Sequence, residues 1–474
     1  MSMAKSKKTK IILTLCCAAV IALASVLPGM AAFNHLLRDV PRMTGLSDIF
    51  LLVSLDDGSV IFSQNENRRT APASLTKVVT TILVLEHVED LQEVVTAQSC
   101  CVNAFAGRQA ALAHIRVGEE LTVETLLYAM MLHSANDAAQ MLAHHVGGDC
   151  GPTFVAMMNA FVQRLGLENT RFANAHGLDE SNHYTTAADM AVISRYAYGR
   201  EFSGSAIFER MAGSLRFTMP ETNLRNPQHL VNTNRMINRY FPQYFLSDVM
   251  GGKTGFTGDA GRCIMATASR AGFRFLVIVM GGQDAAVNDG PVRNTAKLDA
   301  RALLEWAFAN ITMQQVTETD RAVAEIPVAM ARHTDHVQLV PAEQLFAFVP
   351  DGVHAGNVLL VPIAEDMPEE LVAPVVAGQH VGRARIMFAG AEFAQVDLVA
   401  AEDVDRSATL YFVELARRAV QTTIARVLLV IVLGVAALYL VLVLIQRSKK
   451  KNERQMSVVP GVTTRYNDKS GKRR

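Results

Sequence analysis

Residues 71–87 read APASLTKVVTTILVLEH, a segment in which a proline and a serine stand just ahead of a strongly apolar run. Pro72 and Ser74 are typical of a helix start, and the apolar residues that follow predict a helix buried over most of its surface. Lys77 lies on the same helical face as Ser74, one turn along. A lone lysine in such a helix is costly to bury without partners, so this pair marks a candidate site inside a domain.

Segments before and after this helix predict strands, and the stretch between them predicts helices. Alternating apolar residues and turn signals indicate a hairpin over residues 49–65 and further strands at 263–269 and 273–282. Helical patterns dominate residues 119–198, and a last helix is expected at 298–308. Strands at both ends predict an α/β domain over 44–312 whose sheet joins its N- and C-terminal segments.

Residues 316–405 have a different texture. Short apolar runs such as VQLVP and NVLLVPIA alternate there with Pro, Gly and acidic residues. This pattern is typical of a small all-β sandwich. Because the region holds no cluster of catalytic residue types, we expect it to serve as a structural spacer.

Both ends of the chain pair an apolar run with basic residues. Lysines precede the apolar residues 11–27, which end at small residues, so 1–32 is interpreted as a secretory signal peptide, with an uncleaved N-terminal anchor as the alternative. Residues 427–445 are apolar throughout and long enough for a transmembrane helix. A juxtamembrane segment precedes it at 406–426, and a basic tail follows at 446–474. Positive charge marks the cytoplasmic side, so the chain between the two apolar runs is predicted to lie outside a cell membrane.

The composition narrows the class of partner. The 474 residues are 50% hydrophobic and carry a formal net charge of zero, which argues against nucleic acid as a partner. Four cysteines follow the expected signal: Cys100, Cys101, Cys150 and Cys263. An exported protein permits disulfides, with three possible connectivities, and small buried residues are the alternative. None of the four shows metal-ligand spacing.

Three short motifs stand in order along the predicted α/β domain: Ser74-Leu75-Thr76-Lys77, Ser134-Ala135-Asn136 and Lys253-Thr254-Gly255. Each also occurs by chance elsewhere, in the signal, the hairpin or the tail, where no site could form. Burial would lower the pKa of Lys77 so that it could accept the proton of Ser74. Ser134 and Asn136 lie at a turn between helical patterns, from which both side chains could enter one cleft. Glycines around Lys253 and Thr254 would allow an anionic substrate terminus close to the backbone.

The three motifs together resemble those of the penicillin-recognising serine enzymes. The segment NAHGLDESNHYTTAADMAVISRYA, residues 174–197, is similar to one branch, the low-molecular-mass penicillin-binding proteins or D-alanyl-D-alanine carboxypeptidases. The resemblance covers roughly 48–405. It implies a β-lactamase/transpeptidase-like α/β fold, with a sheet and a helical cluster, followed by the β domain and one transmembrane helix. It also implies removal of the terminal D-alanine from peptidoglycan stem pentapeptides, with β-lactams as inhibitors and no metal or cofactor.

The resemblance implies a role for each motif residue. Ser74 is expected to be the acylated nucleophile and Lys77 its general base, while Ser134 and Asn136 relay a proton and orient the substrate. The strand motif is expected to bind substrate, with the terminal carboxylate on Lys253 and Thr254 beside Gly255. The N–H groups of Ser74 and Phe256 are expected to form the oxyanion hole. Arg293 is a further expected carboxylate ligand, although residues 283–292 depart from the family's spacing.

Two other functions are alternatives to a carboxypeptidase, and several histidines are alternatives to the motif residues as catalytic or metal-binding groups. A class A β-lactamase would carry a Glu-x-x-Leu-Asn segment, which is absent. A catalytically silent penicillin sensor would retain penicillin binding without releasing D-alanine. His133 and His176 are alternative bases that we interpret as structural. His144-His145 lacks the HExxH pattern of a zinc peptidase.

Overall fold

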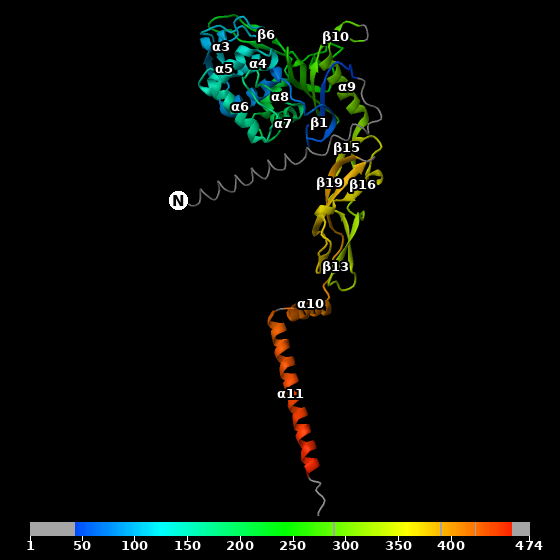
Figure 1. The fold of residues 1–474 in the computed structure, drawn as a ribbon. Coiled ribbons are helices and arrows are strands. Elements are labelled where there is room, and N and C mark those ends of the chain that lie inside the picture. The colour runs from blue at the N-terminus through cyan, green and yellow to red at the C-terminus, as the bar shows by residue number, and fades with distance from the viewer. Residues whose placement is uncertain (1–42, 288–289, 389–390, 422, 457–474) are drawn as a thin grey trace, which may run out of the picture. The chain divides into compact units, whose positions relative to one another are not determined.

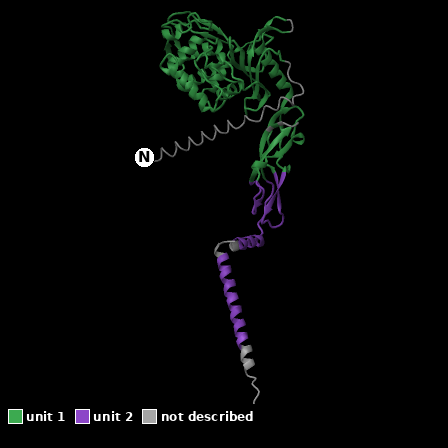
Figure 2. Cartoon of the chain, in the orientation of Figure 1, with its two compact units in different colours: residues 1–323, 340–367, 380–399 green, residues 324–339, 368–379, 400–474 purple. Residues whose placement is uncertain are grey.

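The computed structural model describes residues 43–287, 290–388, 391–421 and 423–456. The predicted signal peptide and the last part of the predicted tail lie outside these residues. The chain divides into two compact units (Figure 2). The first comprises residues 1–323, 340–367 and 380–399, and the second comprises 324–339, 368–379 and 400–474. The predicted domain limits of 44–312 and 316–405 stay a prediction.

A five-stranded sheet forms the centre of the first unit (Figure 1), in the order β2-β1-β9-β8-β7. Its strands are β1 (Ile49–Ser54), β2 (Val60–Gln64), β7 (Val249–Thr257), β8 (Gly261–Arg270) and β9 (Phe273–Gly282). All four neighbouring pairs are antiparallel. The register of β1 on β9 pairs Phe50 with Val279. The predicted joining of N- and C-terminal segments in one sheet is therefore confirmed.

Both faces of this sheet are covered, as the alternation of its side chains requires. Leu51 and its partner Ile278 belong to the large apolar core shared with the helices. Phe275 points to the other face and packs against Phe308 of α9 (Thr295–Asn310), with ring centroids 5.1 Å apart. Two buried faces explain why β8 and β9 are nearly continuous apolar runs.

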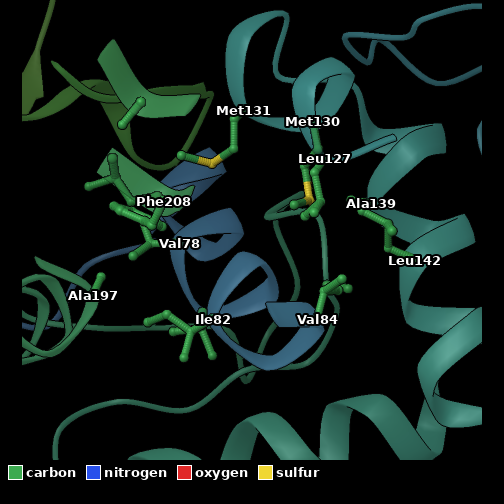
Figure 3. Packing of buried hydrophobic residues seen from close by; sticks show 14 of the residues in the cluster. Val78, Ile82, Val84, Leu127, Met130, Met131, Ala139, Leu142, Ala197 and Phe208 are labelled. Atoms are coloured by element: carbon green, nitrogen blue, oxygen red, sulfur yellow. The ribbon is translucent and has the colours of Figure 1, made fainter. Parts of the chain in front are cut away.

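A helical cluster surrounds α2 (Lys77–His87), which is the predicted buried helix. Its neighbours include α4 (Val123–Leu132), α5 (Asn136–Gly147), α6 (Pro152–Arg164) and α7 (Ala187–Tyr198). Figure 3 shows Val78 and Ile82 of α2 among Leu127, Leu142 and other apolar side chains of these helices. Because α2 is enclosed by other helices, Lys77 near its start is held inside the protein.

Shorter elements complete this part of the first unit. They are α3 (Ser99–Asn103), α8 (Ser205–Gly213), η2 (Ala73–Thr76), η3 (Arg235–Ile237), and the strand pairs β3 (Val94–Thr96) with β4 (Glu120–Thr122), β5 (Arg216–Met219) with β6 (Gln228–Val231), and β10 (Asp284–Ala286) with β11 (Val292–Asn294). A disulfide joins Cys100 in α3 to Cys150, which lies between α5 and α6. Cys101 and Cys263 are free and buried.

The β-rich region contributes strands to each unit. In the first unit, β12 (Ile311–Gln315) pairs with β15 (Phe346–Pro350), and β18 (His380–Phe388) pairs with both β16 (Leu359–Pro362) and β19 (Ala391–Ala400). Two 3-10 turns, η4 (Ala355–Asn357) and η5 (Ala364–Asp366), lie among them. The strand character predicted for this stretch is thus confirmed.

The described residues of the second unit form three strands and two helices. β13 (Ala324–Ala329) pairs with β14 (His336–Pro341) and with β17 (Leu371–Val372). α10 (Ala408–Gln421) is followed by α11 (Thr423–Met456). Within α11, Arg426–Lys449 has a mean hydropathy of 3.2 and is long and apolar enough to cross a membrane, as predicted for 427–445.

Candidate active site

Ser74 and Lys77 meet at the junction between η2 and α2. The 3-10 turn places Ser74 at the surface of the core, whereas Lys77 is 0% exposed. Nζ of Lys77 lies 2.9 Å from Oγ of Ser74. Ala73, just before the serine, has a φ of 46°. A non-glycine residue in this left-handed region is strained, and such strain is typical of functional sites.

The amino group of Lys77 has two further partners, both buried. It donates to Oδ1 of Asn136 at 2.6 Å and to the carbonyl oxygen of His176. Burial lowers the pKa of Lys77 well below its usual value, and the charge of Lys253 lowers it further, against an opposing effect of Asp137. The neutral form of the Lys77 amine is therefore favoured, and this amine contacts the candidate nucleophile Ser74.

The second motif lies at the turn between α4 and α5, as its position in the sequence predicts. Ser134 has a φ of 63°, and Asn136 opens α5 with its N–H on the carbonyl of Ala111 at 2.8 Å. The hydroxyl of Ser134 faces the strand motif, where Nζ of Lys253 donates to its Oγ at 2.9 Å. The left-handed conformation of Ser134 gives the side chain this direction. Lys77 thus contacts Ser74, Lys253 contacts Ser134, and the three motifs lie in one site.

The strand motif lies on β7 beside η2. Lys253 is 1% exposed and also donates to the carbonyl of Thr254 at 2.9 Å. Burial, with the nearby charge of Lys297, lowers the pKa of Lys253 to about 7. Thr254 donates through its hydroxyl to Oγ1 of Thr233 at 2.7 Å. Gly255 has little room for a side chain, since a Cβ there would lie 3.2 Å from the amide nitrogen of Ser74.

Ser74, Ser134, Thr254 and Gly255 line a cavity of about 880 Å³. The buried residues Lys77, Asn136 and Lys253 are not among its lining residues. Its helical side includes Ser74, His133 and Ser134 with the neighbouring segment 109–111, and its strand side runs from Thr254 to Gly258. The remaining lining residues are Leu178, Asp179, Thr233, Arg235, Tyr244, Arg262, Asp284, Val292, Asn294 and Lys297. Phe256, in the strand wall, is 56% exposed.

Three cations lie on the strand side of this cavity, beyond those of the motifs. Lys297, in the first turn of α9, is 8% exposed, and burial together with the charges of Arg235 and Arg262 lowers its pKa to about 8. Arg262 is already engaged, because its Nε donates to Asp284 at 2.9 Å and its guanidinium stacks 3.8 Å above the ring of Phe256. Arg235 stacks 4.4 Å from the ring of Phe241 and Lys297 lies 5.8 Å from that of Tyr244. Neither has an ion pair among the described residues, whereas Arg262 has one.

Arg293 is placed differently from these cations. It lies on β11, where it pairs with Ala285 of β10. Among the described residues that line the cavity, its neighbours Val292 and Asn294 appear but Arg293 does not. Its predicted contact with a substrate carboxylate stays a prediction.

The segment 109–115 on the helical side is fixed from behind by carboxylates. Asp137 of α5 accepts from the N–H groups of Ala113 and Ile115 at 3.0 and 3.1 Å. Arg225 donates to the carbonyl of Ala113 at 2.8 Å and forms an ion pair with Glu119 at 2.6 Å. Both side chains of this pair are buried, with 10% and 0% exposed. No short sequence motif predicts these contacts, because the residues that form them are far apart in sequence.

His176 and His183, near the site, form hydrogen bonds with backbone groups. The carbonyl of His176 holds Lys77, and its ring nitrogen Nδ1 accepts from the N–H of Leu178 at 3.2 Å. His183, which sequence reasoning missed, accepts from the N–H of Ala173 at 2.8 Å and contacts Oγ1 of Thr76 at 2.9 Å. Burial lowers the pKa of His183 to about 4. His133 lines the cavity, but its pKa is lowered chiefly by burial.

The comparison with known proteins agrees with this geometry. Residues 40–284 match the family described as D-alanyl-D-alanine carboxypeptidase, and residues 312–406 match the C-terminal domain of penicillin-binding protein 5. The chain belongs to the D-alanyl-D-alanine carboxypeptidase family. Members of this family are serine-type carboxypeptidases, typically inhibited by penicillin through an acyl-enzyme.

Relatives in the carboxypeptidase family cover most of the chain. It is 27% identical to the D-alanyl-D-alanine carboxypeptidase DacF of Bacillus subtilis, over 77% of this chain and 87% of that protein. It is 26% identical to DacA of Haemophilus influenzae, over 81% and 93% of the two chains. The crystal structure of penicillin-binding protein 5 from Haemophilus influenzae aligns with a TM-score of 0.57 at 25% identity, over 78% of this chain and 99% of that one. The predicted fold, a transpeptidase-like α/β domain with a C-terminal β domain, is thereby confirmed.

Proposed function

We propose that this carboxypeptidase removes the terminal D-alanine from peptidoglycan stem pentapeptides through an acyl-enzyme on Ser74. The observation that carries the proposal is the set of contacts around Nζ of Lys77. A neutral amine has two N–H groups and one lone pair. The oxygens of Asn136 and His176 match the two N–H groups, which leaves the lone pair for the hydroxyl of Ser74 at 2.9 Å.

In the first step, Lys77 takes the proton of Ser74 as Oγ attacks the carbonyl carbon of the last peptide bond. The amide nitrogens of Ser74 and Phe256 are proposed to stabilise the oxyanion. The approach of Gly255 to the Ser74 amide supports this assignment, because β7 can then lie directly beside the nucleophile.

In the second step, the C–N bond breaks and D-alanine leaves as a neutral amine. Ser134, which contacts Lys253 at 2.9 Å, is proposed to give its proton to this nitrogen and to recover one from Lys77. Lys77 thereby passes on the proton that it took from Ser74 and is neutral again. Water then attacks the ester carbonyl while Lys77 takes one of its protons, the bond between the acyl carbon and Oγ of Ser74 breaks, and Lys77 returns the proton to Oγ as the shortened peptide leaves.

The strand side is proposed to bind the carboxylate of the terminal D-alanine. Lys253 and Thr254 supply an ammonium and a hydroxyl. Lys297 and Arg235 add positive charge in the same cavity, which favours an anion over a neutral terminus.

The catalytic domain is proposed to act outside the cell membrane, with α11 as its anchor. The candidate span ends at Lys449, within a basic run that continues to Lys451. Positive charge of this kind marks the cytoplasmic end of a span. The preceding residues would then face the cell wall, where stem peptides ending in D-Ala-D-Ala are found.

The first test measures D-alanine release from diacetyl-Lys-D-Ala-D-Ala by the full chain in detergent, with and without penicillin. We expect penicillin-sensitive release, and loss of both release and covalent labelling by fluorescent penicillin in Ser74→Ala. The loss should be at least about 10³-fold in kcat/KM. Labelling that persists in Ser74→Ala would exclude Ser74 as the nucleophile. Labelling without release by the unaltered chain would instead support a sensor or a transpeptidase.

A further inference from the structure

Three cysteines and a histidine converge outside the cavity, where α3, α5 and the start of α6 meet. Cys100 and Cys101 lie on α3, His144 lies in the last turn of α5, and Cys150 follows in the connection to α6. One ligand atom from each of these four residues lies within 4.8 Å of all the others. None of the four lines the active-site cavity. The proposed reaction therefore does not explain why they are gathered.

The spacing of these atoms is close to that of a tetrahedral metal site. Zinc bonds of about 2.3 Å to sulfur and 2.0–2.1 Å to nitrogen place two sulfurs about 3.8 Å apart, and a sulfur and a nitrogen about 3.6 Å apart. Sγ of Cys100 lies 3.9 Å from Sγ of Cys101, and Sγ of Cys150 lies 3.8 Å from Nδ1 of His144. The bonded pair, Cys100 and Cys150, would have to separate for a metal to enter.

Glycine turns and hydrogen bonds fix the backbone around the cluster. Gly148 ends α5 with a φ of 76°, and Gly151 begins the next helix with a φ of 131°, so the chain turns sharply and returns Cys150 toward His144. Gln140 donates to the carbonyl of Cys150 at 2.8 Å, and the thiol of Cys101 contacts the carbonyl of Gln140 at 3.7 Å. Asp149 accepts from the N–H of Gly151 at 2.9 Å. These contacts are independent of the disulfide.

We propose that Cys100, Cys101, Cys150 and His144 form a four-ligand site for a soft divalent cation such as Zn²⁺ when the Cys100–Cys150 disulfide is reduced. Thiolates and an imidazole are the donors that Zn²⁺ prefers. The disulfide and the metal exclude each other, because each needs the same two sulfurs. Binding releases the protons of three thiols, including that of Cys101, whose pKa burial raises to about 11.

The test uses the full chain in detergent, reduced with a phosphine and kept free of oxygen. The phosphine and one water convert the disulfide to two thiols and a phosphine oxide. Co²⁺ is then added as the probe, because tetrahedral thiolate ligation gives strong visible d–d bands and a thiolate-to-cobalt charge-transfer band. We expect one Co²⁺ per chain, its displacement by one Zn²⁺, and no binding before reduction.

Matched variants separate this site from nonspecific binding. Cys101→Ser, Cys150→Ser and His144→Gln should lose stoichiometric binding in the presence of a competing chelator. Cys263→Ser and His145→Gln, which leave the cluster intact, should keep it. Circular dichroism checks that each variant is folded. Equal binding by His144→Gln and His145→Gln, no binding by the reduced chain, or a disulfide that resists reduction would each overturn the proposal. None of these readouts depends on D-alanine release.

Discussion

The two sides of the active-site cavity each hold a buried lysine, and their surroundings differ. On the helical side, Lys77 is surrounded by oxygens of Ser74, Asn136 and His176. On the strand side, Lys253 donates to oxygens of Ser134 and Thr254 and lies near Lys297, which lines the cavity together with Arg235. Burial lowers the pKa of both lysines. The difference is that Lys77 contacts the hydroxyl of Ser74, which suits proton transfer, whereas Lys253 lies near the cation Lys297 of the cavity lining, which suits anion binding.

The largest effect should come from removing the proton acceptor on the helical side. Lys77→Gln keeps a polar side chain at the position but cannot take the proton of Ser74. We expect acylation by penicillin and D-alanine release to fall by about 10²–10⁴-fold, measured by stopped-flow labelling. Lys77→Arg, whose guanidinium stays protonated, should fall as far. Acylation at the normal rate in Lys77→Gln would remove the distinction between the two lysines.

A second change weakens the support behind the helical wall. Glu119→Gln leaves the buried guanidinium of Arg225 without its carboxylate, and breaking such a pair costs about 3–5 kcal/mol. We expect a lower midpoint of thermal unfolding by circular dichroism, together with a raised KM because segment 109–115 loosens. The control is Glu120→Gln, at an exposed neighbouring position. Equal midpoints for the two variants would mean that the ion pair contributes nothing.

On the strand side the expected effect is smaller and falls on binding. Lys297→Gln removes one cation from the cavity, and we expect KM to rise about tenfold, the equivalent of one charge-assisted hydrogen bond, with kcat less affected. Arg301→Gln on the same helix, outside the cavity lining, serves as the control. A fall in kcat with KM unchanged would place Lys297 with the catalytic groups instead.

The smallest effect is a shift in the pH profile. Because the pKa of Lys253 is lowered to about 7, the free enzyme loses this charge as the pH rises, and kcat/KM should fall above pH 7 or so. At lower pH, protonation of Lys77 should reduce kcat/KM as well. Since Lys297 contributes to lowering the pKa of Lys253, the alkaline limb of Lys297→Gln should move to higher pH. An unmoved limb would show that another group controls it.

The motif residues could be predicted from the sequence because the residues of each motif are close together in the chain. Ser74 and Lys77 are one helical turn apart, Ser134 and Asn136 flank one residue, and Lys253 sits in a glycine-rich strand. The three motifs meet in the structure through the contacts of Lys77 with Asn136 and of Lys253 with Ser134. The helix at 71–87 and the strands at both ends of the domain were likewise marked by hydrophobic periodicity.

The remaining site residues could not be found in this way. Lys297 begins a helix that reads as ordinary, and Arg225 and Glu119 are separated by a hundred residues of unrelated pattern. Their roles depend on tertiary contacts, which local periodicity does not encode. The same holds for the cysteines, where three connectivities remained open and His144 gave no signal beyond its neighbour His145.

The pairing of β1 with β9 has a consequence for how the protein is made. Strand β1 must wait for a partner from the far end of the domain, and Ser74 and Lys253 come from the same two ends. Pairing between such distant segments forms late in folding. During synthesis, therefore, the emerging chain could not close its sheet or acquire hydrolytic activity until residue 282 had been added. The topology itself delays enzyme activity until the strand at the far end of the domain has been synthesised.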